Sequence, residues 1–309
     1  MFVVCGEALM DVFAAGDTPT GVALDARVGG SPFNVAVGLA RLAQPVAFFS
    51  AVSNGFLGER LMQALQAEGV DCATVTRLDA PTTLGLVGLD AKGVPSYSFY
   101  GDHCADRLLA AEAIGLLPAR ITALQVGSYA TVVQPVAGTL RTLVEREHRR
   151  TPVCYDPNVR LNVEPSLQPW RDMLHWMLPR THLLKISEED LHLLRPGTAP
   201  EKFAGEALAA GVGLVVVTRG AQGAAAWTRR GEAAVPAQSL EVVDTVGAGD
   251  TFQAALLTWL AEHDCLAIEQ MPKLSSGQLH EALGFAAAAA AITCSRRGAD
   301  LPRRAELPR

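Results

Sequence analysis

Short apolar runs alternate with longer helix-like segments along most of this chain, and this alternation limits the possible folds more than any other feature. Strands are expected at Phe2–Cys5, Val46–Ala51, Leu124–Val126, Val153–Tyr155, His182–Lys185 and Leu214–Thr218, and helices between them at Asn34–Ala43, Leu57–Ala67, Val136–Arg146 and Lys202–Ala210. Such alternation predicts an α/β fold with a mainly parallel central sheet covered by helices. In folds of this class, ligands bind beyond the carboxyl ends of the strands.

Two segments interrupt the alternation. Residues 11–28 and 73–101 contain extended runs and turn signals without an intervening helix, so they are expected to form a small separate sheet. Such a sheet can close over a site as a lid and exclude water. The alternative is a β-hairpin extension that serves only oligomer contact. The whole chain, residues 1–309, is expected to be one domain into which this lid is inserted.

Composition excludes several functional classes. The 309 residues are 49% hydrophobic, and a net charge of −6 without a dense Lys/Arg run argues against nucleic-acid binding. Glu7 and Asp11 interrupt the N-terminus before a signal-like stretch develops, and the apolar run Leu283–Cys294 is too short to span a membrane. Six scattered cysteines form no C-x-x-C pair, so neither a zinc site nor a disulfide framework is expected. A cytoplasmic protein without a membrane partner is predicted.

The segment 243–252 combines two glycines, a carboxylate and a helix start. A helical face follows, formed by Phe252, Ala255, Leu256, Trp259 and Leu260. Gly247 and Gly249 therefore lie at a helix N-terminus, where free backbone N–H groups and the helix dipole favour an anion such as phosphate. Asp250 would repel phosphate unless it takes a proton from the attacking hydroxyl. The alternative is that Asp250 only caps the helix.

A second loop-to-helix junction lies at 29–34. Gly29 and Gly30 allow close approach of a ligand to the backbone, Ser31 or Gly30 can cap the helix, and Pro32 suits its first turn. Asn34 offers both a donor and an acceptor to ligand hydroxyls, which a plain junction does not require. This segment is therefore a candidate ligand site.

Polar residues also follow several of the expected strands. Glu7 and Asp11 come after the first strand and can accept hydrogen bonds from a polyol, although solvated loop charges are the alternative. The segment 156–160 ends in Arg160, which can bind phosphate or carboxylate unless the segment is only an Asp-Pro turn. The segment 185–190 contains acids that can hold Mg²⁺ through waters. The alternative is that its serine only caps the helix that follows. The turn 218–223 can pass under nucleotide phosphates or only connect two strands.

Taken together and in this order, these motifs resemble the ribokinase-like, PfkB-type carbohydrate kinases along essentially the whole chain. The segment 244–252, Asp-Thr-Val-Gly-Ala-Gly-Asp-Thr-Phe, is similar to the C-terminal signature of that family. The segment 29–36, Gly-Gly-Ser-Pro-Phe-Asn-Val-Ala, is similar to its N-terminal signature. The resemblance implies a three-layer α/β/α fold with a small β-sheet lid, and ATP with Mg²⁺ as cofactors.

The resemblance also assigns roles to residues. It implies that Asp250 is the catalytic base and that the backbone N–H groups of Gly247, Ala248 and Gly249 stabilise the transferred phosphoryl group. It places the sugar at Asp11, Gly30 and Asn34, and the nucleotide at Thr218, Gly220 and Gly223. Gly29 and Arg160 are further candidates for the sugar, and Ser187 for the nucleotide. Asp190 would hold Mg²⁺ through water, and Asp244 would help to bind a monovalent cation such as K⁺ with backbone carbonyls of residues 293–298.

Within the family, the segments 6–11, 105–107, 156–160 and 185–187 look most like bacterial fructokinases, so D-fructose is the expected acceptor. Other acceptors remain open, among them 2-keto-3-deoxygluconate and nucleosides, and so does a non-catalytic sensor of sugar or nucleotide. Three positions depart from the usual family pattern: the turn 53–58 lacks an acid pair, Ser187 and Asp190 stand where many members have Asn and Glu, and Gly101 stands where several have arginine. A homodimer through the lid sheet is also expected.

Overall fold

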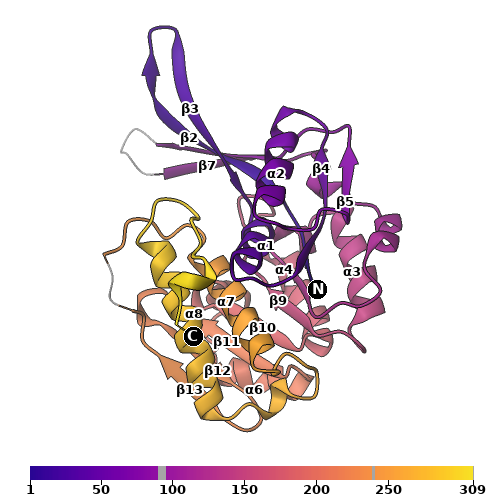
Figure 1. Ribbon diagram of the computed structural model, residues 1–309, viewed down its shortest axis with the longest axis vertical. Coiled ribbons are helices and arrows are strands. Elements are labelled where there is room, and N and C mark those ends of the chain that lie inside the picture. The colour runs from indigo at the N-terminus through magenta and orange to yellow at the C-terminus, as the bar shows by residue number, and fades with distance from the viewer. Residues whose placement is uncertain (90–94, 239–240, 309) are drawn as a thin grey trace.

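Nine strands form one mainly parallel sheet at the centre of the structure, a computed structural model that describes residues 1–89, 95–238 and 241–308 (Figure 1). Across the sheet, the order is β13 (Glu232–Val235), β12 (Ala224–Trp227), β11 (Leu214–Thr218), β10 (Leu183–Ser187), β9 (Val153–Asp156), β8 (Leu124–Gly127), β1 (Phe2–Cys5), β4 (Val46–Ser53) and β5 (Val75–Leu78). All pairings from β11 to β5 are parallel, whereas β12 is antiparallel to both of its neighbours. The predicted sheet is confirmed.

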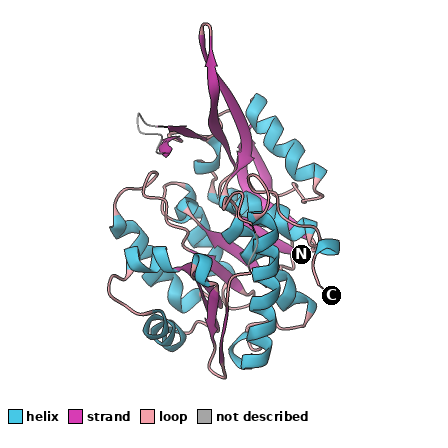
Figure 2. Ribbon diagram, turned by 90° about the vertical axis from the view of Figure 1, so that its left-hand side faces the viewer, coloured by secondary structure: helices cyan, strands magenta, loops and turns pink. Residues whose placement is uncertain are grey.

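Helices cover both faces of this sheet (Figure 2). One face packs against α1 (Ser31–Arg41), α2 (Phe56–Ala67), α7 (Ala248–Glu262) and α8 (Ser276–Cys294), and the other against α3 (Val136–Glu147), α4 (Leu167–Met177), α5 (Glu188–Leu194) and α6 (Pro200–Ala210). β1 shows the reason: Phe2 and Val4 enter the first core, whereas Val3 and Cys5 enter the second. Because successive strand residues point to opposite faces, an uninterrupted apolar strand needs helices on both sides. The expected three layers are therefore present.

The order of the strands reverses between β1 and β8. From β1 the chain passes through α1 to β4 on one side, and it later returns to β8 on the other side of β1. Such a reversal of strand order opens a crevice at the ends of the two strands, where α/β proteins bind ligands. Short helical turns connect the longer elements: η1 (Ala105–Arg107), η2 (Ala111–Leu116), η3 (Tyr129–Thr131), η4 (Leu178–Arg180), η5 (Gly220–Gln222), η6 (Met271–Lys273) and η7 (Arg304–Glu306).

A second sheet of four strands lies beside the first. Its order is β3 (Gly21–Gly29), β2 (Leu9–Thr18), β6 (Leu84–Leu89) and β7 (Pro95–Tyr100). The hairpin of β2 and β3 extends away from the main body in both views (Figures 1 and 2). The expected small sheet is thus confirmed with different bounds: β2 begins at Leu9, and Val75–Leu78 pairs with β4 in the large sheet. Residues 90–94 of the expected lid segment lie outside the described part of the chain.

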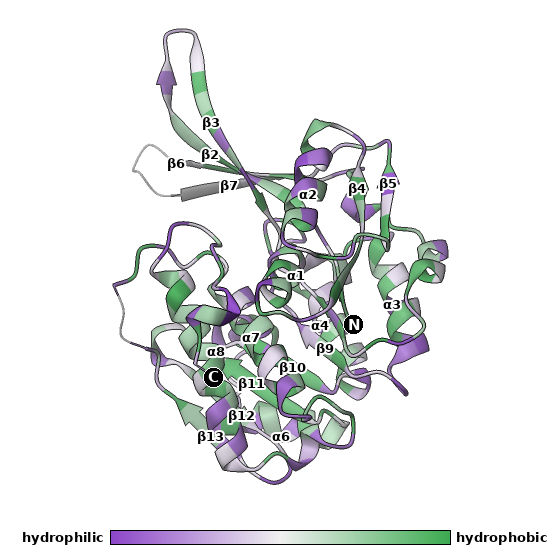
Figure 3. Ribbon diagram, viewed as in Figure 1, coloured by the Kyte–Doolittle hydropathy of each residue, from purple (hydrophilic) through white to green (hydrophobic). Residues whose placement is uncertain are grey.

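Local sequence explains most element bounds. α1 begins at Ser31, earlier than the expected Asn34, because Pro32 fits its first turn and Gly30 occupies the N-cap position. β4 is largely green along its length in Figure 3, as its burial on both faces requires.

Within residues 1–89, 95–238 and 241–308, no helix is both long and apolar enough to cross a membrane.

Candidate active site

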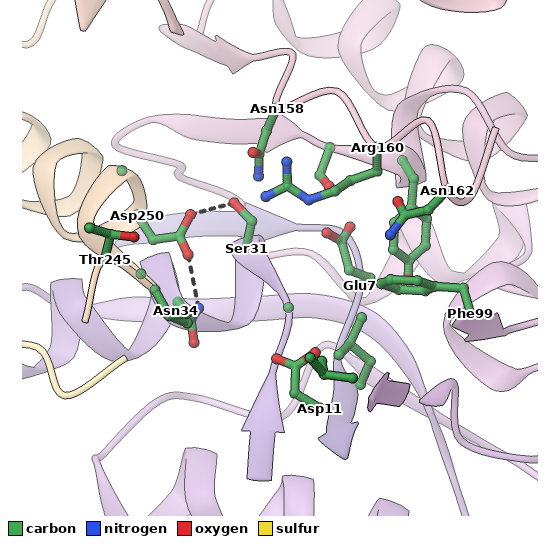
Figure 4. Close-up of a pocket in the computed structure, with 18 of the residues that line it drawn as sticks. Glu7, Asp11, Ser31, Asn34, Phe99, Asn158, Arg160, Asn162, Thr245 and Asp250 are labelled. Carbon is green, nitrogen blue, oxygen red and sulfur yellow. Dashed lines mark hydrogen bonds between the residues drawn. The ribbon is translucent and has the colours of Figure 1, made fainter. Parts of the chain in front are cut away.

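A cavity of about 440 Å³ opens at the carboxyl ends of β1, β8, β9 and β10, at the predicted edge of the sheet. Seven of the predicted site residues line it, namely Asp11, Gly30, Asn34, Arg160, Gly247, Gly249 and Asp250. They come from the small sheet, α1, the loop after β9 and the start of α7 (Figure 4). The structure therefore joins the two glycine-bearing segments, which are more than 200 residues apart in the sequence, in one site.

Asp250 is held by two side chains of α1. The hydroxyl of Ser31 donates to Asp250 Oδ1 at 2.6 Å, and Asn34 Nδ2 donates to Oδ2 at 2.8 Å (Figure 4). Ser31 therefore does not cap its helix, and Gly30 at the N-cap position has no side chain to do so. Both carboxylate oxygens are fixed, as a base that must face one hydroxyl requires.

Opposing effects act on the acidity of Asp250. Burial raises the pKa of this carboxyl, whereas the hydrogen bonds from Ser31 and Asn34 and the charges of Lys185 and Arg160 lower it. The net direction is upward. A base of raised pKa removes a proton from a hydroxyl more readily than an ordinary carboxylate does.

The N-terminus of α7 lies directly beside this carboxyl. Gly247 occupies the N-cap position in a left-handed conformation with φ 78°, which glycine adopts without strain. Ala248 N–H donates to the Thr245 carbonyl at 3.2 Å, so this group is already engaged. In the described part of the chain, Gly249 N–H has no hydrogen-bond acceptor and faces the cavity. The turn thus presents a partial positive charge to an anion next to Asp250.

A buried ion pair adds a full positive charge at the same place. Lys185 Nζ contacts Asp156 Oδ2 at 2.6 Å, and each side chain is 6% exposed. A Cβ atom added to Gly249 would lie 3.3 Å from Lys185 Nζ, so the ammonium group lies against the start of α7. Lys185 also lines the cavity. An anion bound at this helix terminus therefore meets both the helix dipole and an ammonium group.

Asp11 also lines the cavity. Its pKa is raised to about 6 because burial, together with the Asp250 charge, outweighs the opposing charge of Arg160. The carboxyl lies between two glycines: a Cβ at Gly29 would come within 2.2 Å of Asp11 Oδ2, and one at Gly85 within 2.9 Å of Oδ1. Gly29 does not line the cavity itself. Its observed role is to leave space for the Asp11 carboxyl, which differs from the predicted ligand contact.

The four predicted nucleotide residues lie beside the cavity and do not line it. Ser187 and Thr218 are paired in register at the ends of β10 and β11, and Gly220 and Gly223 flank the turn η5 that follows. The Ser187 hydroxyl accepts a hydrogen bond from Asp190 N–H at 3.0 Å, so this side chain caps α5. The alternative N-cap interpretation of Ser187 is thus what the structure shows.

Asp190 and Asp244, the predicted metal residues, also lie outside the cavity lining. Asp190 is 8% exposed, and burial together with the Asp156 charge raises its pKa to about 6. Asp244 accepts hydrogen bonds from Val246 N–H at 3.0 Å and from Gly298 N–H at 2.8 Å. It therefore connects the loop before α7 to the predicted segment 293–298.

Among the polar side chains that line the cavity without a role assigned from the sequence are Ser128, Asn162 and Lys185. For Lys185 a signal was present, because a lysine within the buried strand β10 needs a partner or a function. Ser128 follows β8 with φ 55°, a left-handed conformation that is uncommon outside glycine. No sequence pattern indicates this conformation.

Comparisons with known proteins place this chain in a family. The family model described as pfkB family carbohydrate kinase matches residues 1–305. A fructokinase of Rhizobium leguminosarum bv. trifolii is 32% identical over 90% of this chain and 85% of its own length. The structure of Xylella fastidiosa fructokinase with bound ATP matches 99% of this chain and 94% of that chain, with 26% identity and a TM-score of 0.85. Fructokinase of Vibrio cholerae O395, in a form with bound fructose, ADP and calcium ion, matches 96% and 94%, with 26% identity and a TM-score of 0.78.

Proposed function

The chain belongs to the pfkB family of carbohydrate kinases, and on that premise we propose that it transfers the γ-phosphoryl group of ATP to D-fructose. The observation that carries the proposal is the position of Asp250, fixed by Ser31 and Asn34 beside the free N-terminus of α7. A proton acceptor and an anion-binding turn then face the same cavity. The relatives named fructokinase, and the Vibrio cholerae protein with bound fructose, support the choice of acceptor.

In the proposed reaction, Asp250 takes the proton of a primary sugar hydroxyl as its oxygen attacks the γ-phosphorus in line. A new bond forms between the sugar oxygen and phosphorus, and the bond from phosphorus to the bridging oxygen breaks, with its electron pair leaving on ADP. The backbone at Gly247 and Gly249 and the Lys185 ammonium group stabilise the negative charge on the transferred group. Ala248 joins them once its N–H leaves the Thr245 carbonyl. Asp11, Gly30, Asn34 and Arg160 bind the sugar.

We propose that ATP lies along Ser187, Thr218, Gly220 and Gly223, and that Asp190 faces its magnesium ion through water. The local chemistry fits a hydrated cation, because within the described residues Asp156 Oδ1 is buried without a hydrogen-bond partner, and burial together with the Asp156 charge raises the pKa of Asp190. Mg²⁺ retains several waters and needs only one or two protein carboxylates. When bound, it neutralises charge on the phosphates.

A monovalent cation is proposed beside Asp244, held by backbone carbonyls of residues 293–298. Asp244 supports such a site by holding the loop in place, since both of its oxygens accept backbone hydrogen bonds. The potassium ion in another form of the Vibrio cholerae fructokinase is consistent with this proposal.

We further propose that the enzyme works in the cytoplasm as a homodimer joined through the small sheet, which also closes over the acceptor. All six cysteines are free thiols, as suits a reducing compartment. Val22 and Leu24 on β3 are 54% and 53% exposed, which supports burial of that strand against a second copy.

A panel of acceptors tests the proposed function. Release of ADP is measured with D-fructose, D-ribose, 2-keto-3-deoxygluconate and a nucleoside, each with magnesium and ATP. We expect the highest kcat/KM with D-fructose. A higher value for another acceptor overturns the choice of sugar, and a folded protein without turnover on any acceptor overturns the kinase proposal.

2-Keto-3-deoxygluconate is the second candidate acceptor. Its carboxylate can pair with Arg160, an exposed guanidinium group that lines the cavity. D-Fructose remains the first choice because the relatives reported above are fructokinases.

The Ser31→Ala variant tests the base directly. The Ser31 hydrogen bond lowers the pKa of Asp250, so its loss raises that pKa. Because the base works deprotonated, the acid limb of the kcat profile moves to higher pH, by about half to one unit for a hydrogen bond of ordinary strength. The profile is measured from pH 5 to 9 at saturating substrates. An unchanged or acid-shifted limb contradicts the assignment.

A further inference from the structure

Glu7 is a buried carboxyl that the proposed reaction leaves without a task. It follows β1, lines the cavity and is 2% exposed. Its Oε2 atom is buried and has no hydrogen-bond partner in the described part of the chain. Within the same residues, no Lys, Arg or His nitrogen lies within 4 Å of its carboxyl oxygens. An ionised carboxylate with an unpartnered oxygen and no counter-ion in contact is costly to bury.

The surroundings of Glu7 also disfavour a negative charge. Asp106, in η1, is 2% exposed and acts on Glu7 as a like charge. Asp106 is already satisfied, because Thr83 donates to its Oδ1 at 2.5 Å and Tyr129 donates to its Oδ2 at 2.8 Å. Among the described residues, the cation that lowers the pKa of Glu7 is Arg160, which lines the same cavity. A proton on Glu7 removes the repulsion from Asp106.

A second polar group with unmet hydrogen-bonding capacity lies next to Glu7. In the described part of the chain, the Ser128 side chain is 1% exposed, lines the same cavity and makes no well-formed hydrogen bond, although its hydroxyl lies close enough to the Glu7 carboxyl to lower the pKa of that group. Figure 4 shows the Glu7 carboxyl directed into the space that Arg160 enters from the other side. Two buried polar groups at the cavity wall, each with an unmade hydrogen bond, indicate that a ligand supplies what is missing.

On the premise of the proposed sugar kinase, we propose that Glu7 binds the acceptor as an uncharged acid, donating a hydrogen bond to a sugar oxygen, with Ser128 as the neighbouring polar contact. Glu7 is thus a specificity-determining residue at the end of the cavity away from the reacting hydroxyl. A neutral acid offers both a donor and an acceptor to a polyol, whereas a carboxylate only accepts. This differs from the purely accepting role expected from the sequence.

The acidity of Glu7 supports this assignment and supplies a test. The pKa of Glu7 is raised to about 8 because burial, together with the Asp106 charge, outweighs the opposing effects of Ser128, the Glu7 backbone and Arg160. Glu7 is therefore mostly protonated at pH 7 and loses its proton above pH 8. The other charged or titratable groups that face it are Asp106, Tyr129 and Arg160, and the Tyr129 pKa lies well above its usual value.

The test compares the wild-type protein with the Glu7→Gln variant, whose side chain stays an uncharged donor at every pH. In the wild type, KM for D-fructose is expected to rise about tenfold per pH unit above the pKa of Glu7, because only the protonated form binds. In Glu7→Gln, KM stays nearly flat from pH 7 to 9.5. In Glu7→Leu, which has no donor, KM is high at pH 7. A flat wild-type KM, or an equal rise in Glu7→Gln, overturns the proposal.

Calorimetry gives a readout independent of turnover. Binding of D-fructose at pH 8.5 is expected to take up a proton in the wild type, seen as a dependence of the binding heat on the ionisation enthalpy of the buffer, and to take up none in Glu7→Gln. Equal proton uptake in both proteins overturns the proposal. Thermal unfolding of each variant separates these effects from a loss of fold.

The two proposals fail in different ways. If the wild type turns over D-fructose with a pH-independent KM, only the role of Glu7 fails. If another acceptor of the panel is the substrate, the same measurements are made with that acceptor. If no acceptor is turned over, the proposed function itself fails.

Discussion

Replacement of Asp250 by asparagine is expected to lower kcat by about 10²- to 10⁴-fold, the usual contribution of a positioned general base. Asparagine keeps the shape of the side chain. Its Oδ1 can accept from Asn34, and its Nδ2 can donate to Ser31, whose hydroxyl can turn to accept. The α1–α7 contact is therefore retained while the proton acceptor is lost.

Steady-state release of ADP measures this effect, and equilibrium binding of ATP serves as the control. Because the nucleotide residues lie beside the cavity and away from Asp250, the Kd for ATP is expected to stay within about threefold of the wild-type value, less than 1 kcal/mol. A variant with nearly full kcat refutes the assignment of the base. A large loss of ATP affinity indicates a structural role instead.

Replacement of Lys185 by methionine is expected to cost about 3–5 kcal/mol of unfolding free energy, because Asp156 is left as an uncompensated buried charge. Burial leaves this carboxylate with little water to replace the ammonium group. Urea unfolding monitored by tryptophan fluorescence gives the free energy directly. A loss below about 1 kcal/mol, the range of an exposed pair, contradicts the buried pair described above.

The double variant Lys185→Met with Asp156→Leu separates stability from catalysis. Replacing both charges by apolar residues is expected to restore most of the lost stability, as found for buried ion pairs replaced by apolar groups. We expect kcat of this folded double variant to remain about 10²- to 10³-fold low, because the ammonium group beside Gly249 no longer stabilises the transferred charge. Recovery of both stability and kcat limits Lys185 to a structural role.

Residue positions that follow from local pattern were predicted well. The helical spacing of the apolar residues after Asp250 predicts a helix start near Gly247, and α7 indeed begins at Ala248. Contacts between distant segments were not predictable, since no local pattern indicates that the Ser31 hydroxyl reaches Asp250, 219 residues away. The same limit explains why Val75–Leu78 was assigned to the small sheet. Its sequence fits a strand in either sheet, and its pairing with β4 depends on tertiary context.

For Glu7, the position was predictable and the charge state was not. A carboxyl after the first strand of an α/β fold lies near the ligand-binding edge, so a polyol contact followed from the sequence. Its protonation depends on burial and on Asp106, a residue nearly 100 positions away in the chain. Such environments exist only in the folded molecule.

The contact of α1 with α7 also has a consequence for the order of events during folding. Ribosomes complete α1 long before Asp250 is synthesised, so the base becomes oriented only when the first and last thirds of the chain dock. Contacts of such high sequence separation form slowly, because a long loop must close first. Recovery of phosphoryl transfer during refolding should therefore lag behind the recovery of secondary structure. The return of enzyme activity then reports the rate of the final long-range docking.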